Sequence, residues 1–133
     1  MRVLLTTPYL EGQVDVFNLP ENSYDLLRLP EPVLNAVRRL FAPELGARLL
    51  GPGGVALYPF GEHQYAIYNM TDAPAKVALR LPPAIPAPTW KELLHGKVLA
   101  TAELEEGHES AARKESEVAL TLLPFEIVLL ESR

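Results

Sequence analysis

The residues of this chain that could carry out chemistry are few, and their spacing does not indicate a catalytic centre. The three histidines, His63, His95 and His108, fall in turn-like or charged stretches, and no pair has metal-site spacing such as H-x-x-x-H. None of the four serines lies in a G-x-S-x-G elbow, the usual context of a serine nucleophile. We expect solvated turn histidines, no catalytic residue and no bound metal.

Carboxylates gather in one polar run, at Glu103, Glu105, Glu106 and Glu109. Glycosidic cleavage needs two carboxylates about 5–10 Å apart on rigid elements, whereas a charged run without apolar alternation is typical of a solvated surface. The glycine-rich segment 51–54 lacks the lysine and the following helix of a phosphate-binding loop. We therefore predict no catalytic activity in this chain alone and no cofactor.

Aromatic residues are better candidates for a binding role. Carbohydrate-binding modules use exposed aromatic side chains, because a sugar ring has an apolar face as well as hydroxyl groups. The candidate ligand contacts are Tyr58, Tyr65, Tyr68 and Trp90. On alternating strands such residues also serve as core or cross-strand packing, so both interpretations stay open.

Three other aromatic residues, Tyr9, Phe17 and Tyr24, fall in an irregular N-terminal arm that has no evident core of its own. Aromatic side chains are enriched at protein–protein interfaces. We interpret these three as candidate contacts with another chain or domain.

Composition excludes several classes of partner. The formal net charge is −5 and no run of Lys and Arg offsets it, which disfavours nucleic acid and anionic membrane surfaces. No segment approaches the length of a membrane span. The chain has no cysteine, so it has neither disulfides nor thiolate sites, which fits a cytoplasmic protein.

Residues 55–81 organise the chain. Apolar residues alternate with other residues along 55–60, 65–70 and 77–81, and turn formers separate these runs. Period-2 apolarity bounded by Gly, Asp and Pro predicts three consecutive strands, here an antiparallel meander with one face in a core.

The remaining elements are shorter. Residues 2–6 and 15–17 are predicted as extended, 18–24 as loop and 47–50 as extended. Pro30 and Pro32 suit a helix start, and apolar residues at helical spacing follow, with Asn35, Arg38 and Arg39 on the opposite, polar face.

The C-terminal half continues the pattern of short strands. Residues 82–89 are dense in proline and predict a stiff crossover between sheets. A hairpin is predicted around His95-Gly96, an exposed loop over 100–116, and strands over 118–122 and 125–130.

Together these elements predict a mainly β fold. We expect an antiparallel two-sheet Greek-key sandwich of about seven or eight short strands, with one N-terminal helix at about residues 31–42. Residues 1–46 would form an arm and helix that pack on the sandwich or on a partner, and residues 47–133 would form the sandwich.

Several short motifs resemble the C-terminal β-sandwich domains that follow the catalytic barrel in many bacterial glycoside hydrolases, including β-galactosidase-type enzymes. The resemblance covers about residues 29–131, and its matching segments are 29–38, 65–70, Asn69-Met70-Thr71-Asp72-Ala73-Pro74, Leu93-Leu94-His95-Gly96 and Leu122-Leu123-Pro124-Phe125-Glu126 through Glu131. The catalytic carboxylates of that family lie on the barrel, so the resemblance carries over no catalytic residue.

Three hypotheses follow. The first is a non-catalytic module that acts in domain packing or assembly, whose partner is a glycosidase barrel or a second copy of the chain. The second is a carbohydrate-binding module, and the third is a small glycosidase-related enzyme. An exposed apolar patch would favour the packing module. Exposed aromatic residues on one face would favour the carbohydrate-binding module, and a pocket with convergent ionisable groups would favour the enzyme.

Overall fold

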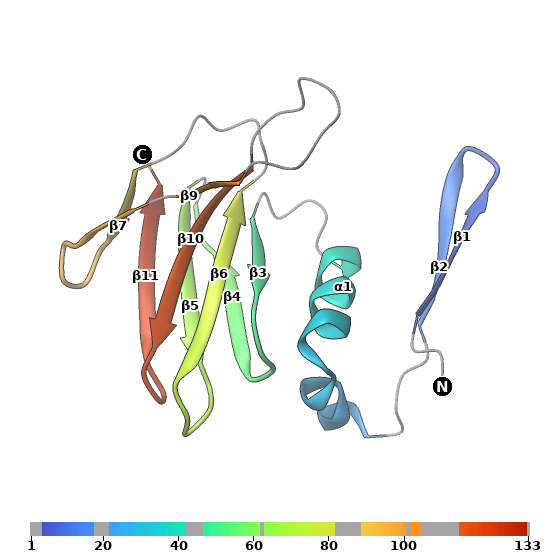
Figure 1. The fold of residues 1–133 in the computed structure, drawn as a ribbon, viewed down its shortest axis with the longest axis horizontal. Helices are drawn as coiled ribbons and strands as arrows, with labels where there is room; N and C mark the ends of the chain where they lie inside the picture. The colour runs from blue at the N-terminus through green and yellow to red at the C-terminus, as the bar shows by residue number, and fades with distance from the viewer. Residues whose placement is uncertain are drawn as a thin grey trace.

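The computed structural model describes residues 4–17, 22–41, 47–61, 63–81, 89–100, 102–104 and 115–132. Its main body is two antiparallel sheets that pack face to face (Figure 1). The first sheet has four strands in the order β3 (Arg48–Leu50), β6 (Ala75–Leu81), β10 (Glu115–Leu122) and β9 (Ala102–Leu104). The second has five, in the order β4 (Val55–Pro59), β5 (Gln64–Asn69), β11 (Ile127–Ser132), β7 (Trp90–Glu92) and β8 (Val98–Leu99).

The core lies between these two sheets. Along β5 and β6 every second residue is buried, as expected for strands with one face in a core. Ile67, Leu79 and Leu130 are fully buried and come from both sheets. Burying a side chain of this size contributes about 1.5–3 kcal/mol. The predicted two-sheet sandwich is therefore confirmed.

The predicted meander over residues 55–81 is wrong in its third strand. β4 and β5 pair as a hairpin, with Leu57 opposite Ile67. β6 instead crosses to the other sheet and pairs with β3 and β10. On the side of β5 away from β4, its neighbour is β11. Alternation along one strand places one face in the core but does not say in which sheet the strand lies.

Asn69 holds the turn at which the chain crosses over after β5. Its buried side-chain amide donates hydrogen bonds to the carbonyls of Ala73 (2.8 Å) and Leu123 (2.9 Å). Its Oδ1 accepts from the amide (3.1 Å) and the hydroxyl (2.7 Å) of Thr71. One side chain thereby fixes the β5–β6 turn and ties it to the β10–β11 turn. The Asn-x-Thr-Asp-x-Pro motif is thus a structural turn.

The C-terminal strands follow the prediction with one exception. β7 and β8 form the expected hairpin. The predicted proline-rich crossover falls mainly on residues 82–88, outside the described residues, and the strands before and after it belong to different sheets. Within the predicted loop 100–116, β9 and the start of β10 pair as strands, with Glu115 opposite Leu104. These residues pair as strands although their sequence shows no alternation of apolar and polar residues.

The N-terminal arm is more regular than predicted. β1 (Leu4–Tyr9) and β2 (Gly12–Phe17) pair over their full length, and this hairpin stands apart from the sandwich in Figure 1. Of the predicted loop 18–24, residues 18–21 lie outside the described residues. From Ser23 the chain forms a 3-10 helix, η1 (Ser23–Arg28), whose N-cap is Asn22.

The helix α1 (Glu31–Phe41) agrees with the predicted span and packs beside β3. Leu34 and Val37 are buried on its inner face. Asn35 and Arg38, which were predicted on the polar face of the helix, are half-buried and bind the 51–55 turn. The division of the chain at residue 46 stays a prediction.

Candidate functional site

Two of the four aromatic ligand candidates are core residues. Trp90 is fully buried and Tyr65 is 4% exposed, and their ring centroids lie 5.8 Å apart at a tilt of 54°. Burial raises the pKa of the Tyr65 hydroxyl. Neither ring has a face open to a ligand, because strand alternation turns both toward the opposite sheet. This corrects the prediction that they contact a sugar.

The other two candidates, Tyr58 and Tyr68, lie on the outer face of the five-stranded sheet. The register places Ala56 opposite Tyr68 and Tyr58 opposite Ala66, so the two tyrosines are diagonal neighbours. Tyr58 is 54% exposed and Tyr68 is half-buried.

Apolar residues on β11 continue this surface. Ile127 lies opposite Tyr68, and Leu129 lies opposite Ala66. We call six of the outward side chains of these three strands the apolar face: Ala56, Tyr58, Ala66, Tyr68, Ile127 and Leu129. At one end of this surface the outward residues are polar, and Gln64 donates a hydrogen bond to Glu131 at 3.1 Å.

The outer face of the four-stranded sheet differs in character. The outward residues of β6 and β10 are mostly charged, polar or small: Lys76, Ala78, Arg80, Glu117, Ala119 and Thr121. The outer face of the five-stranded sheet is therefore mainly apolar over β4, β5 and β11, whereas the outer face of the four-stranded sheet is mainly polar.

The three interface candidates occupy the arm. Tyr24 lies on η1 with 73% of its surface exposed. Tyr9 ends β1 and Phe17 ends β2, and the side chains of both lie outside the described residues. Tyr24 lies on η1 and is not part of the apolar face.

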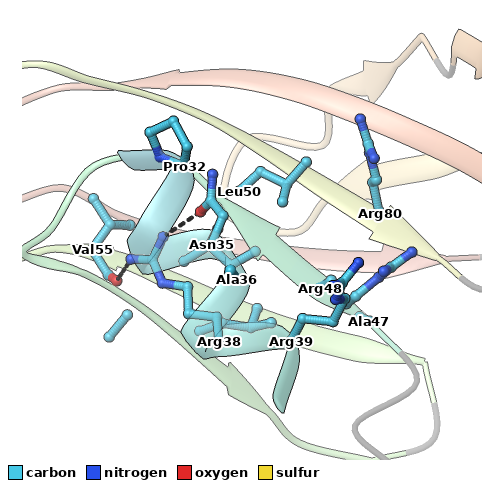
Figure 2. Close-up of a pocket in the computed structure, with 13 residues that line it drawn as sticks. Pro32, Asn35, Ala36, Arg38, Arg39, Ala47, Arg48, Leu50, Val55 and Arg80 are labelled. Carbon is cyan, nitrogen blue, oxygen red and sulfur yellow. Dashed lines mark hydrogen bonds between the residues drawn. The ribbon is translucent and has the colours of Figure 1, made fainter. Parts of the chain in front are cut away.

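A cavity of about 470 Å³ lies where α1 meets the edge of the sandwich (Figure 2). Helix α1 and strands β3, β4 and β6 all contribute to its lining. The residues around it are Pro32, Asn35, Ala36, Arg38, Arg39, Ala47, Arg48, Leu49, Leu50, Val55, Ala56, Leu57 and Arg80. Four of these are arginines, and the others are apolar except Asn35.

Arg38 joins the helix to the turn before β4. Its guanidinium donates hydrogen bonds to the carbonyls of Gly51 (2.7 Å), Pro52 (2.9 Å) and Val55 (3.1 Å), and to Asn35 Oδ1 (3.1 Å). Figure 2 shows the bonds to Val55 and Asn35. Burial lowers the pKa of Arg38, and the charge of Glu31 opposes this shift. Every acceptor that this guanidinium touches is neutral.

Arg48 and Arg80 lie directly opposite each other on β3 and β6. Arg80 also donates through Nε to Glu117 Oε2 at 2.7 Å. Arg39 is exposed on α1, and its guanidinium has no hydrogen bond or ion pair to any residue of the described ranges. The described lining has four arginines and no carboxylate, and Glu117 offsets the charge of Arg80, so the lining as a whole carries a net positive charge.

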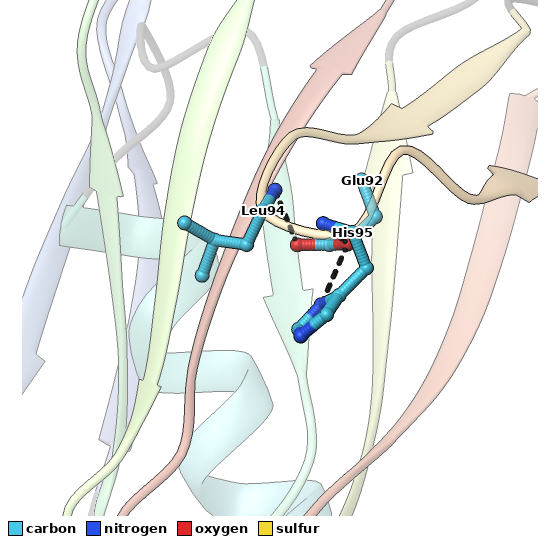
Figure 3. A network of polar contacts seen from close by, with 3 residues as sticks. All are labelled: Glu92, Leu94 and His95. Carbon is cyan, nitrogen blue, oxygen red and sulfur yellow. Dashed lines mark hydrogen bonds and ion pairs between the residues drawn. The ribbon is translucent and has the colours of Figure 1, made fainter.

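Glu92 and His95 form a second polar cluster, at the β7–β8 turn (Figure 3). The Glu92 carboxylate is buried and accepts hydrogen bonds from the amides of Leu94 (2.8 Å) and His95 (2.6 Å). The His95 ring lies 3.0 Å from it through Nδ1. Burial raises the pKa of Glu92, but the hydrogen bonds and the nearby ring outweigh burial, so this pKa lies below its ordinary value.

This cluster is a turn motif. The two amides come from the turn itself, and the side chain of His95 is 69% exposed. His63 is also exposed, and His108 lies outside the described residues. Within the described ranges no group of three or more His, Cys, Asp or Glu could hold a metal ion.

The pocket suits binding better than bond breaking. Its described lining has no carboxylate, histidine, serine or cysteine that could act as nucleophile, acid or base. Guanidinium groups are instead suited to recognising carboxylates and phosphates. Neither helix in the described part of the chain has the length and apolarity needed to cross a bilayer.

Sequence reasoning missed the pocket arginines and Glu92. Arg39, Arg48 and Arg80 are far apart in the chain and meet only through sheet register and helix packing. For Glu92, the available signal was a carboxylate just before Leu-Leu-His-Gly, where a side chain can cap a turn.

The fold belongs to the class of antiparallel two-sheet β-sandwiches, here with a helix along one edge. Comparison with protein-family models, with curated proteins and with solved structures gives no significant match to this chain.

Proposed function

We propose that this chain is a non-catalytic β-sandwich module that acts by packing against another domain or chain. The apolar face of the five-stranded sheet is the observation that supports the proposal. A β-sandwich needs only its inner faces to be apolar. An apolar outer face opposite a polar one is typical of a surface that a partner covers.

Residues on the apolar face are exposed enough for their burial by a partner to contribute to binding. Tyr58 and Ile127 are each about half exposed, at 54% and 49%. Burial of apolar surface contributes about 25 cal/mol per Å². Two aromatic rings beside aliphatic side chains therefore give a partner both area and shape to bind.

The partner that we propose is a catalytic barrel of the glycoside hydrolase kind or a second copy of the chain. The resemblance to accessory domains of glycoside hydrolases supports the barrel as partner, and the motifs that carry this resemblance lie in turns. Residues 69–74, 93–96 and 122–126 lie at the β5–β6, β7–β8 and β10–β11 connections. A cytoplasmic location stays part of this proposal, on the absence of cysteine.

Dye binding tests whether the apolar face is accessible and binds apolar molecules. We expect the native chain to enhance the fluorescence of anilinonaphthalene sulfonate, because this dye binds exposed apolar surface. The double variant Tyr58→Lys/Ile127→Lys should lose most of the enhancement. The matched variant Ala119→Lys/Thr121→Lys, at exposed positions of the polar outer face, should keep it. Equal fluorescence from the two variants, or none from the native chain, would refute the proposal.

A carbohydrate-binding role is the second candidate, because Tyr58 and Tyr68 are diagonal neighbours on one outer face. Calorimetric titration with a linear oligosaccharide should then give saturable heat that Tyr58→Ala removes, since stacking on a sugar needs the ring. No heat from the native chain would dismiss this candidate.

A further inference from the structure

We propose that the pocket between α1 and the sandwich edge binds a small organic carboxylate with an apolar body. This site shares only Ala56 with the apolar face, and its ligand does not depend on the docking role. The proposal rests on the charge of the lining, on the apolar residues of the lining and on the volume of the pocket.

The charge is concentrated and comes from separate elements. Arg38 and Arg39 come from α1, Arg48 from β3 and Arg80 from β6. The hydrogen-bond acceptors of Arg38 are all neutral, so its positive charge is not cancelled by an ion pair. The described lining has no carboxylate, but Glu117 pairs with Arg80 and offsets its charge. An entering anion is therefore attracted mainly by the two helix arginines, Arg38 and Arg39.

One guanidinium is placed to contact an entering anion. Arg38 is held by three backbone carbonyls and cannot turn toward a ligand without breaking those bonds. Arg39, its neighbour on the helix, is exposed and makes no such bonds within the described ranges. We therefore assign the direct contact to Arg39, with Arg38 supplying a fixed charge elsewhere in the lining.

The apolar part of the lining selects among anions. Ala36, Ala47, Leu50, Val55 and Leu57 give the pocket a hydrocarbon surface. Inorganic phosphate or sulfate has nothing to place against that surface, whereas an organic acid buries its apolar body there. The volume of about 470 Å³ lies within the range of small-molecule sites.

Calorimetry with 3-phenylpropionate as the probe tests this site, and 3-phenylpropanamide is its neutral match. We expect the carboxylate to bind the native chain at least about tenfold more tightly than the amide, because a hydrogen bond to a charged group contributes about 1.5–3 kcal/mol. Inorganic phosphate should bind at least about tenfold more weakly than the probe, because it has no apolar group to bury against the apolar residues of the lining.

Variants locate the binding. Arg39→Gln should weaken 3-phenylpropionate at least about tenfold, with an unchanged circular dichroism spectrum because the side chain is exposed. Arg28→Gln, at an exposed arginine of η1 outside the pocket, should bind like the native chain. Equal affinity for acid and amide, equal affinity for phosphate, absence of binding, or equal loss in the two variants would each overturn the proposal.

Discussion

Glu92 is a buried carboxylate, and the β7–β8 turn stabilises its negative charge. The pKa of Glu92 lies below its ordinary value because three hydrogen bonds outweigh the effect of burial, which would raise it. The ionised form therefore stabilises the fold above the unfolded-state pKa of about 4.3. That contribution is lost as the pH falls through the lower, folded-state pKa.

Glu92→Gln tests this account. The amide group of Gln cannot accept all of these hydrogen bonds, so the free energy of unfolding near neutral pH should fall by about 1–3 kcal/mol. The loss of stability below about pH 5 should also become shallower. Urea unfolding across this pH range gives both quantities. Glu11→Gln, at the exposed β1–β2 turn, is the control, and an unchanged pH dependence in Glu92→Gln would contradict the account.

Single residues also show where sequence reasoning ends. Alternation implies that Tyr65 and Tyr68, three residues apart on β5, face opposite sides of the sheet, since residues two apart on a strand share a face. It did not reveal which of the two sides faces the core, and Tyr65 and Trp90 proved to be buried. That choice depends on the opposing sheet, which lies far away in the chain.

At the scale of elements, Arg38 is the main polar link between α1 and the sandwich. Its fork of donors satisfies the carbonyls of Gly51, Pro52 and Val55. Removing the fork leaves these acceptors partly unsatisfied in a half-buried place, where each is costly.

We expect Arg38→Met to lower the free energy of unfolding by about 2–4 kcal/mol. Arg38→Lys should restore little of it, because an ammonium group cannot reproduce a planar fork. Arg39→Met is the matched control on the same helix and should change stability by no more than about 0.5 kcal/mol. Chemical denaturation measures all three. Full recovery in Arg38→Lys would show that charge alone holds the helix.

Elements differ in how well local pattern predicts them. The span of α1 followed from its apolar spacing and its prolines, which act within one helix. The sheet of β6 and the existence of β9 did not, because both depend on pairing with β10. The pocket was equally invisible, since its arginines approach one another only after that pairing is set.

At the scale of the whole molecule, the two outer faces of the sandwich have different roles in this account. The polar face, with Arg80 and Glu117 paired across strands, suits solvent. The apolar face lies over β4, β5 and β11, of which β4 is an edge strand. A partner that covers this face would therefore also lie beside the edge of β4, where the Val55 carbonyl already accepts a hydrogen bond from Arg38.

Sedimentation equilibrium tests the docking account most directly, because self-association is the form of docking that the chain can show alone. We predict that its mean mass rises above 14.7 kDa as the concentration approaches about 1 mM, where a contact of roughly 4 kcal/mol is half-occupied. Tyr58→Lys/Ile127→Lys should remain at the monomer mass, and Ala119→Lys/Thr121→Lys should associate like the native chain. A native chain that stays monomeric throughout would rule out a second copy as the partner, and association that survives Tyr58→Lys/Ile127→Lys would contradict the role of the apolar face.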